Sequence, residues 1–314
     1  GLVLILSAPV WGADAEKFPE RPIRMVVPFP PGSASDFLAR VVGQRLSEVY
    51  GQQVVVDNRP GAGGLIGSQI VAKAIPDGYT ISMIGQPQLS NTLLRDPHPY
   101  DPLKDFASVT LVAIIPNVIV IGNGVPAANV KELIALAKAK PGQLNFGSAG
   151  VGSSSHLAGE MMVGAAGIKA VHVPFKTLGD IFAEMIAGRV HFYVFPLPAA
   201  MPMLKEGRLR PLAVATKKRS AALPNVPTTA EAGFAEYLSE SWFGYVTPAG
   251  VPKRLIVKLN ADIIKILQQP DVRERFQQQG AEASYGTPEQ FHDLQRDEYA
   301  RLGKLIQELG IKVQ

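Results

Sequence analysis

The sequence predicts a two-lobed α/β protein whose lobes are joined by two crossing strands. Short β-branched runs alternate with segments of helical period near the start of the 314-residue chain and again in its middle. Two further strand-like runs, 117–126 and 241–252, end in glycine and proline and can each carry the chain between lobes. We therefore expect two α/β sheets, with residues 16–118 and 244–314 in the first lobe and residues 119–243 in the second.

Within each expected lobe, a strand is followed by a helix or a loop. The strands of the first lobe are expected at 23–28 before a helix at 35–49, at 53–58 before a helix at 63–74, and at 79–85 before a polar loop. Those of the second lobe are expected at 144–150 before a helix at 154–164, at 169–175 before a helix at 179–187, and at 190–195 before the segment 197–207. After the second crossing only helices are expected, at 252–269, 271–280 and 287–309, where apolar residues recur every three or four positions. We expect these helices to pack on the first sheet.

Composition and the first residues narrow the class of protein. The net charge of +4 is spread along the chain without a basic block, so no nucleic acid partner is expected. The absence of cysteine excludes disulfides and thiolate catalysis. Residues 1–15 are a short apolar run followed by small residues, with Ala13 and Ala15 at the spacing of a signal-peptidase site. We expect them to be a truncated signal-peptide remnant, cleaved near Ala15, and the protein to be exported; an apolar N-terminal strand is the alternative.

Two loops rich in glycine and serine stand where ligands bind in open α/β sheets, between the end of a strand and the start of a helix. The first is "FPPGSASD", Phe29–Asp36, and the second is "GSAGVGSSS", 147–155. Free N–H groups at a helix start and serine hydroxyls suit a carboxylate or a phosphate. One such loop in each lobe predicts a clamp for a ligand with two anionic ends, or with one carboxylate and a polar tail. Two well-capped helices that bind nothing are the alternative.

The sequence does not favour an enzyme, a cofactor or a metal. In "NRPGAGGLIGSQ" the third glycine of a dinucleotide fingerprint would have to be residue 66, which is Ile66. Neither "GSASD" nor "GSSSH" fits the G-x-S-x-G elbow of a serine hydrolase. His172 and His191 lie in strand-like runs, and no histidine pair has metal-ligand spacing. We expect a binding protein without catalysis.

Several segments, in order, resemble one family. They include "FPERPIRMVVPFPPGSASDFLAR", "VVVDNRPGAGGLIGSQIVAKAIPDGYT", "PGQLNFGSAGVGSSSHLAGE" and "VPTTAEAGF". With them the chain resembles the tripartite tricarboxylate transporter receptors, the Bug or TctC-type periplasmic solute-binding proteins. The resemblance implies a periplasmic-binding-protein-like, Venus-flytrap fold, a cleft that traps a small organic carboxylate, and delivery to membrane permease subunits. We expect a monomer; an adaptor that presents the ligand to a sensor kinase is the alternative.

Carried over to this sequence, the resemblance assigns ligand contacts to the two loops, to the loop after the third strand at 86–90, and to residues near the cleft. Lys176 is expected to complement a second anion or to be a solvated surface lysine, and His156 to donate to the ligand or to cap its helix. The expected ligand-binding residues are Phe29, Gly32, Ser33, Ala34, Ser35, Asp36, Gln86, Gln88, Ser148, Ala149, Gly150, Gly152, Ser153, Ser154, His156, Phe175, Lys176 and Phe195.

Phe195 marks a departure from the family. Family members often read Asp-Asn-Leu-Pro where this chain has Phe-Pro-Leu-Pro at 195–198. Loss of the acid disfavours amino acids as ligands, and phenylalanine offers a flat apolar wall. We expect Phe195, with Phe29 and Phe175, to enclose an aromatic body such as that of terephthalate. An aliphatic di- or tricarboxylate is the alternative ligand, and core packing is the alternative role of Phe195.

Overall fold

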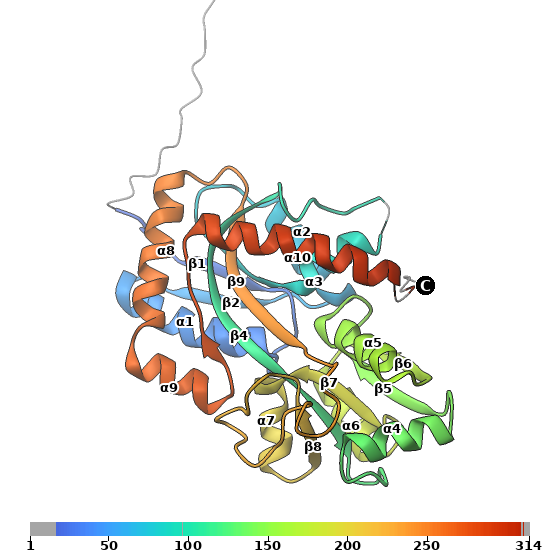
Figure 1. Cartoon of the computed structure of the whole chain (residues 1–314). Coiled ribbons are helices and arrows are strands. Elements are labelled where there is room, and N and C mark those ends of the chain that lie inside the picture. The colour runs from blue at the N-terminus through green and yellow to red at the C-terminus, as the bar shows by residue number, and fades with distance from the viewer. Residues whose placement is uncertain (1–16, 96, 309, 311–314) are drawn as a thin grey trace, which may run out of the picture.

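The protein has two α/β lobes joined through one long strand (Figure 1). The structure is a computed structural model that describes residues 17–95, 97–308 and 310. The expected signal-peptide remnant, 1–15, lies outside the described residues. The two-lobed α/β fold that the sequence predicts is confirmed.

The first lobe is built on a sheet in the order β2-β1-β3-β9-β4, in which β1 runs parallel to β2 and β3 while β9 is antiparallel to its neighbours. Its strands are β1 (Ile23–Val27), β2 (Val54–Asn58), β3 (Thr80–Gly85), β4 (Phe106–Gly122), β9 (Glu240–Pro248) and the short β10 (Glu282–Ala283) beside β4. Its helices are α1 (Ala34–Tyr50), η1 (Ala62–Gly64), α2 (Leu65–Ala72), α3 (Gln86–Leu93), α8 (Lys253–Leu267), α9 (Pro270–Gln278) and α10 (Pro288–Glu308).

The second lobe repeats this plan around the far end of β4, with β5 parallel to β6 and β7. Its remaining strands are β5 (Leu144–Ser148), β6 (Ala170–Pro174), β7 (Phe192–Pro196) and β8 (Leu209–Val214). Its helices are α4 (Val130–Ala139), α5 (Ser154–Ala166), α6 (Leu178–Ile186) and α7 (Leu197–Lys205).

Both crossings meet at Asn117. Residues 106–116 of β4 pair with β9, whereas residues 117–122 pair with β7 and β8, so one strand of 17 residues belongs to both sheets. The returning chain crosses beside it, because Asn117 N–H donates to Ser239 O at 3.1 Å and Ser239 N–H donates to Ala215 O at 2.8 Å. Hydrogen bonds therefore connect the two sheets to each other at this point. The boundaries expected at 118/119 and 243/244 stay a prediction.

The C-terminal helices pack on the first sheet, as expected. Leu255, Leu259 and Ile263 of α8 share a buried cluster with Met25 of β1, while α10 lies against α3 and β4. The second lobe has separate buried clusters of its own. Its α4 was not expected from the sequence, although Asn129 caps it by accepting the Glu132 N–H at 3.0 Å.

The expected polar loop after β3 is instead the start of α3, which is a correction. Helix α3 begins at Gln86, directly after the strand, and takes in all of 86–90. The Oε1 of Gln88 reaches back to accept the Gly85 N–H at 2.7 Å. A side chain that satisfies a free N–H in this way replaces the loop residues that usually cap a helix.

Candidate functional site

The first of two matching loops joins β1 to α1. Ser33 caps the helix, since its Oγ accepts the Asp36 N–H at 3.3 Å and lies 3.1 Å from Ser35 Oγ. Gly32 has a φ of 80°, and its N–H donates to Asp36 Oδ2 at 2.9 Å. Glycine adopts this left-handed backbone without the strain that other residues meet, which explains its place before the cap.

The second loop joins β5 to α5 and has the same geometry. Ser153 Oγ accepts the His156 N–H at 3.2 Å and lies 3.1 Å from Ser155 Oγ. Gly152 has a φ of 78°, and its N–H donates to His156 Nδ1 at 3.2 Å. The two capping serines also have nearly equal backbone angles, φ −68° with ψ 162° and φ −68° with ψ 159°. One local design therefore occurs once in each lobe.

Each loop presents unpaired N–H groups at the start of its helix. Within the described part of the chain, nothing accepts a hydrogen bond from the N–H of Ala34, Ser35, Ser154 or Ser155. Ala149, by contrast, uses its N–H inside the loop and donates to Ser155 Oγ at 3.1 Å. Free N–H groups at a helix start carry the positive end of the helix dipole, so both loops suit an anion.

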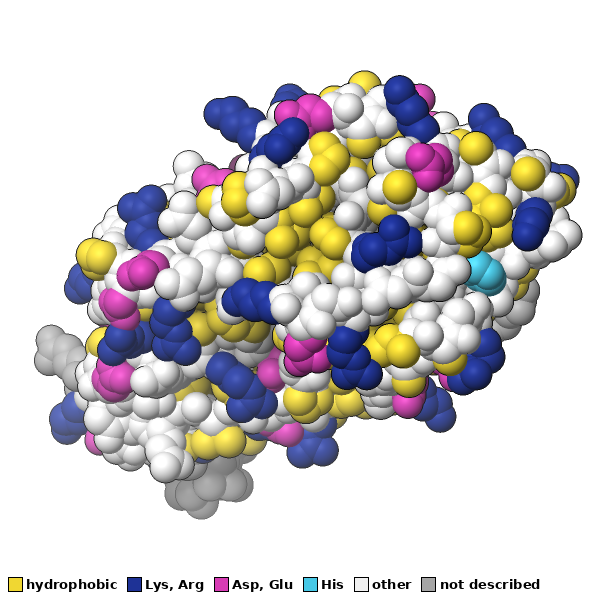
Figure 2. Space-filling model, turned by 90° about the horizontal axis from the view of Figure 1, so that it is seen from below, with side chains coloured by type: hydrophobic (Ala, Val, Ile, Leu, Met, Phe, Trp, Pro, Cys, Tyr) yellow, Lys and Arg dark blue, Asp and Glu magenta, His cyan; other side chains and the backbone are white. Residues whose placement is uncertain are grey.

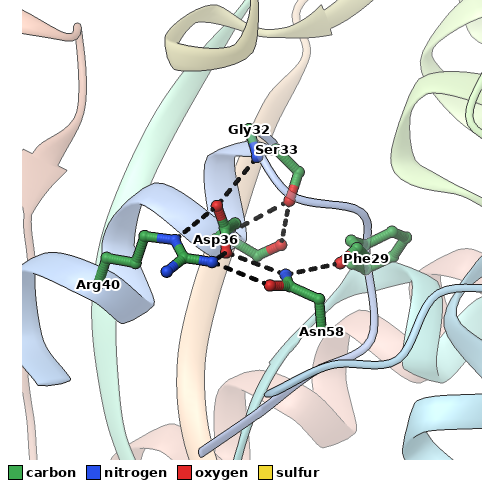
Figure 3. A network of polar contacts seen from close by, with 7 residues as sticks. Phe29, Gly32, Ser33, Asp36, Arg40 and Asn58 are labelled. Carbon is green, nitrogen blue, oxygen red and sulfur yellow. Dashed lines mark hydrogen bonds and ion pairs between the residues drawn. The ribbon is translucent and has the colours of Figure 1, made fainter. Parts of the chain in front are cut away.

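A network of polar contacts with α1 and the end of β2 fixes the first loop (Figure 3). Asn58, at the end of β2, donates to Asp36 Oδ1 at 2.9 Å and to Phe29 O at 3.0 Å. Arg40 Nε donates to Asp36 Oδ2 at 3.0 Å, one helical turn along α1. Asp36 is only 4% exposed, and both of its carboxylate oxygens have protein partners. Its contacts are those of a side chain that fixes the loop.

Two histidines hold the second loop. The ring of His156, which is 4% exposed, lies 4.0 Å from the ring of His172, and its Nε2 lies 3.6 Å from Glu160 Oε1. Ser148 Oγ accepts the Gly150 N–H at 3.1 Å and also forms a hydrogen bond with His172 Nε2, 2.6 Å away. Burial, and then the neighbouring His156, lower the pKa of His172 from 6.5 to about 3.

The lobes touch at the second loop. Ser90 Oγ, on α3, donates to Gly152 O at 2.8 Å. Gly63 faces the same loop, because a Cβ built on it would lie under 3.0 Å from Val151 O. A Cβ on Gly150 would in turn lie 3.4 Å from Gly63 N. We call this arrangement, in which Gly63 and Ser90 contact residues 150–152, the closed state.

Gln88 brings an unused donor close to this contact. Its Nε2 is buried and has no hydrogen-bond partner among the described residues. A Cβ on Gly64 would lie 2.8 Å from that Nε2 and 3.0 Å from Phe29 Cζ, so the amide, the glycine and the ring are neighbours. A buried donor without an acceptor costs about 1–3 kcal/mol, a cost that a ligand oxygen would remove.

The other expected ligand residues differ in where they lie. Phe175 is half-buried beside the second loop, because its N–H donates to Ser148 O at 2.9 Å. Gln86 Nε2 donates to Glu298 Oε1 on α10 at 2.7 Å, and Lys176 is exposed. The structure thus brings together the two loops, Gln88 and Phe175 more closely than it does Gln86 and Lys176.

Phe195 is packed inside the second lobe. It is 1% exposed and stacks on Tyr193 with 3.9 Å between ring centroids and 13° between ring planes. Phe182 covers it from a centroid distance of 6.0 Å. Burial raises the pKa of Tyr193 and the nearby side chain of Ser155 opposes that rise, so Tyr193 rather than Phe195 approaches the second loop. These contacts favour the packing role of Phe195 over a ligand wall.

A groove runs along the crossing strands between α5 and α10, with a volume of about 920 Å³. Leu157 and Met161 of α5, Leu302 of α10 and Trp242 of β9 line it. Figure 2 shows a hollow with a hydrophobic floor and Lys and Arg side chains at its margin on the face seen from below. Of the expected ligand residues, Gln86 and Ser154 line the groove; most of the two loops does not.

Two further features of the structure bear on the class of site. Across the described ranges, no helix is long and apolar enough to cross a membrane. The same residues contain no group of three or more His, Cys, Asp and Glu side chains that could hold a metal ion.

Three residues around the loops were not singled out from the sequence: Arg40 and Asn58 hold the first loop, and Gly63 touches the second. Ser90, the last residue of the expected segment 86–90, also touches the second loop. The i, i+4 spacing of Asp36 and Arg40 was a readable signal for their pairing. The contacts of Gly63 and Ser90 join segments far apart in the chain, and no local pattern encodes them.

Comparison with known proteins identifies the family. The model of the tripartite tricarboxylate transporter family receptor matches residues 38–311. The chain belongs to this family of solute-binding receptors. The protein BugT of Bordetella pertussis is 36% identical over 310 residues, which cover 98% of this chain and 94% of BugT. A protein encoded in the tcbD-tcbE intergenic region of Pseudomonas sp. strain P51 is 39% identical over 294 residues, 93% of this chain and 88% of its own.

Solved structures of similar proteins share the fold. A protein of R. palustris, Rpa4515 with adipate, has a TM-score of 0.90 and 36% sequence identity, over 94% of this chain and 99% of its own. MatC from Rhodopseudomonas palustris with bound malate has a TM-score of 0.86 and 29% identity, over 92% of this chain and 100% of its own. Family and fold are those of periplasmic solute-binding proteins, as the sequence predicts.

Proposed function

We propose that this protein is a periplasmic receptor that traps a small organic dicarboxylate between its lobes and delivers it to the permease subunits of a tripartite tricarboxylate-type transporter. It acts without catalysis, cofactor or metal, and as a monomer. The observation that carries the proposal is the repeated loop: each lobe has a Gly-Ser cap followed by two unpaired N–H groups.

The electrostatics of the loops agree with a carboxylate at each end. The donors are neutral N–H and hydroxyl groups at Ala34, Ser35, Ser154 and Ser155, which water can satisfy when the lobes are apart. A lysine or arginine in the same place would leave an unpaired charge whenever the cleft closed empty. Hydrogen bonds to a charged partner contribute about 1.5–3 kcal/mol each, enough for a few of them to secure a ligand.

The nature of the ligand body is the finer part of the proposal. Terephthalate remains the aromatic candidate, and it now rests on Phe29, because Phe195 is covered by Tyr193 and Phe182. Relatives have been solved with the aliphatic acids adipate and malate. Titration calorimetry with terephthalate, benzoate, adipate, citrate and glutamate separates the two. Tighter binding of terephthalate than of adipate supports the aromatic candidate, tighter binding of adipate removes it, and failure of every dicarboxylate contradicts the proposed function.

Proline at the first helical position tests the N–H groups directly. Ala34→Pro and Ser154→Pro each delete one free N–H, and proline suits this position because the preceding serine is already extended. Loss of one charged hydrogen bond, about 1.5–3 kcal/mol, predicts a Kd higher by roughly 10- to 150-fold for either variant. Lys253→Pro, at the exposed start of α8, is the matched control and keeps the wild-type Kd. Equal affinity in all three variants would show that the helix starts do not hold the ligand.

A further inference from the structure

The position three residues after each capping serine carries a different side chain in the two lobes but makes the same bond. Asp36 accepts the N–H of Gly32 through a carboxylate oxygen, and His156 accepts the N–H of Gly152 through Nδ1. We infer that Asp36 and His156 are equivalent positioning residues, which fix the two anion-binding loops without touching the ligand. The affinity measurement that tests this inference rests on the proposed function. The inference itself concerns the residues that shape the proposed ligand site.

In the first lobe, the carboxylate of Asp36 is fully engaged by the protein. Gly32 and Arg40 donate to one of its oxygens and Asn58 donates to the other (Figure 3). Three protein donors therefore already engage both oxygens of Asp36. The negative charge of Asp36 would also repel a ligand carboxylate placed beside it. The bond to Gly32 instead holds the left-handed glycine that starts the turn into α1.

The second lobe has the same arrangement with different side chains. Four residues along the helix, Arg40 is replaced by Glu160, and the carboxylate partner is replaced by an imidazole. The strand that flanks the loop also contributes in both lobes, with Asn58 at the end of β2 and His172 within β6. Two unlike sets of side chains thus hold one backbone conformation.

The acceptor role of His156 fixes its tautomer. Because Nδ1 accepts the Gly152 N–H, the ring proton is on Nε2, which points to Glu160 Oε1 at 3.6 Å. His172 covers a face of the same ring. Both ring nitrogens of His156 therefore have neighbours inside the lobe, and the side chain reaches the ligand only through the loop.

Two isosteric substitutions separate positioning from direct contact. In His156→Asn the side-chain oxygen takes the place of Nδ1, whereas in His156→Gln the amide N–H takes the place of Nε2–H. We expect His156→Asn to keep the dicarboxylate Kd within about threefold of wild type and His156→Gln to raise it by tenfold or more. The reverse order would show that Nε2 contacts the ligand, and equal affinities in both variants would show that the bond to Gly152 is not needed; either result overturns the inference.

A second readout does not depend on the ligand. Hydrogen exchange of the Gly152 amide, followed by NMR in the ligand-free protein, is expected to stay slow in His156→Asn and to speed up at least tenfold in His156→Gln. Unchanged exchange in His156→Gln overturns the inference even if no carboxylate binds wild type, a result that would by itself contradict only the proposed function. For the first lobe, Asp36→Asn, which leaves one oxygen for Gly32, is expected to bind more tightly than Asp36→Leu; equal loss in both contradicts the pairing with His156.

Discussion

Gly63 is where closure of the lobes can be blocked without touching the ligand. In the closed state a Cβ on Gly63 would lie under 3.0 Å from Val151 O, and 3.2 Å from Asn91 Nδ2. The backbone oxygen cannot rotate away, so Gly63→Ala must push the loops apart. Overpacking of this kind costs about 1–3 kcal/mol. The contact with Asn91 lies within the first lobe, whereas the closer contact with Val151 O applies only when the lobes are together. Under the proposed function the ligand binds the closed state, so the apparent Kd is expected to rise roughly 5- to 150-fold.

A matched control removes the effect of backbone strain. Gly63 has φ 66° and ψ 24°, and Gly51, at the end of α1, has φ 62° and ψ 13° with nothing within 4 Å of a built Cβ. Alanine in this left-handed region costs about 1–2 kcal/mol at either position. Both variants should therefore lose similar unfolding free energy in urea, while only Gly63→Ala weakens dicarboxylate binding by calorimetry. If Gly63→Ala bound as tightly as Gly51→Ala, the contact between Gly63 and Val151 would not be part of the ligand-bound state.

Three further predictions concern His172, Phe195 and Gln88. Because the pKa of His172 is about 3 in the folded protein and 6.5 in the unfolded chain, the unfolded state takes up its proton first, and stability is lost as the pH falls from 6.5 toward 3. The melting temperature of wild type should drop across this window more than that of His172→Phe; equal pH profiles would contradict the lowered pKa. Phe195→Ala should reduce the unfolding free energy by about 3–5 kcal/mol but leave the rank order of carboxylate affinities unchanged, and a reordered panel would return Phe195 to the ligand wall. Gln88→Leu should weaken dicarboxylate binding about tenfold because it removes the unused Nε2 donor; unchanged affinity would place that amide outside the site.

The strands and helices of each lobe could be predicted because their signals are local. Alternation and helical spacing along β1, α1, β5 and α5 depend only on neighbouring residues, and the structure has these elements within a few positions of the expected ranges. The dual membership of β4 could not be read in the same way. Its 17 residues are mostly apolar throughout, and the change of partner at Asn117 is decided by which strands return to it.

In the candidate site, too, features with local signals could be predicted and features that depend on distant residues could not. Glycine and serine before a helix indicated both loops, since capping is a matter of a few adjacent residues. The direction of each side chain was not encoded there. Asp36 was expected at the ligand, yet its partners Arg40 and Asn58 turn it into the lobe. Phe195 was expected at the cleft, but Tyr193 lies two residues away on the same face of β7 and stacks on it.

The repeated loop has a consequence for selectivity. A ligand with two carboxylates can meet the same pair of N–H groups at both ends, whereas a monocarboxylate meets only one pair. The second pair also lies on the loop that Ser90 and Gly63 contact, so an anion held by both lobes adds its own bonds to those of closure. A molecule that fills one loop leaves the other pair of N–H groups buried without an acceptor, at a cost of about 1–3 kcal/mol for each group. Under the proposed function, preference for dicarboxylates comes less from the attraction of one anion than from the penalty that closure imposes on an incomplete ligand.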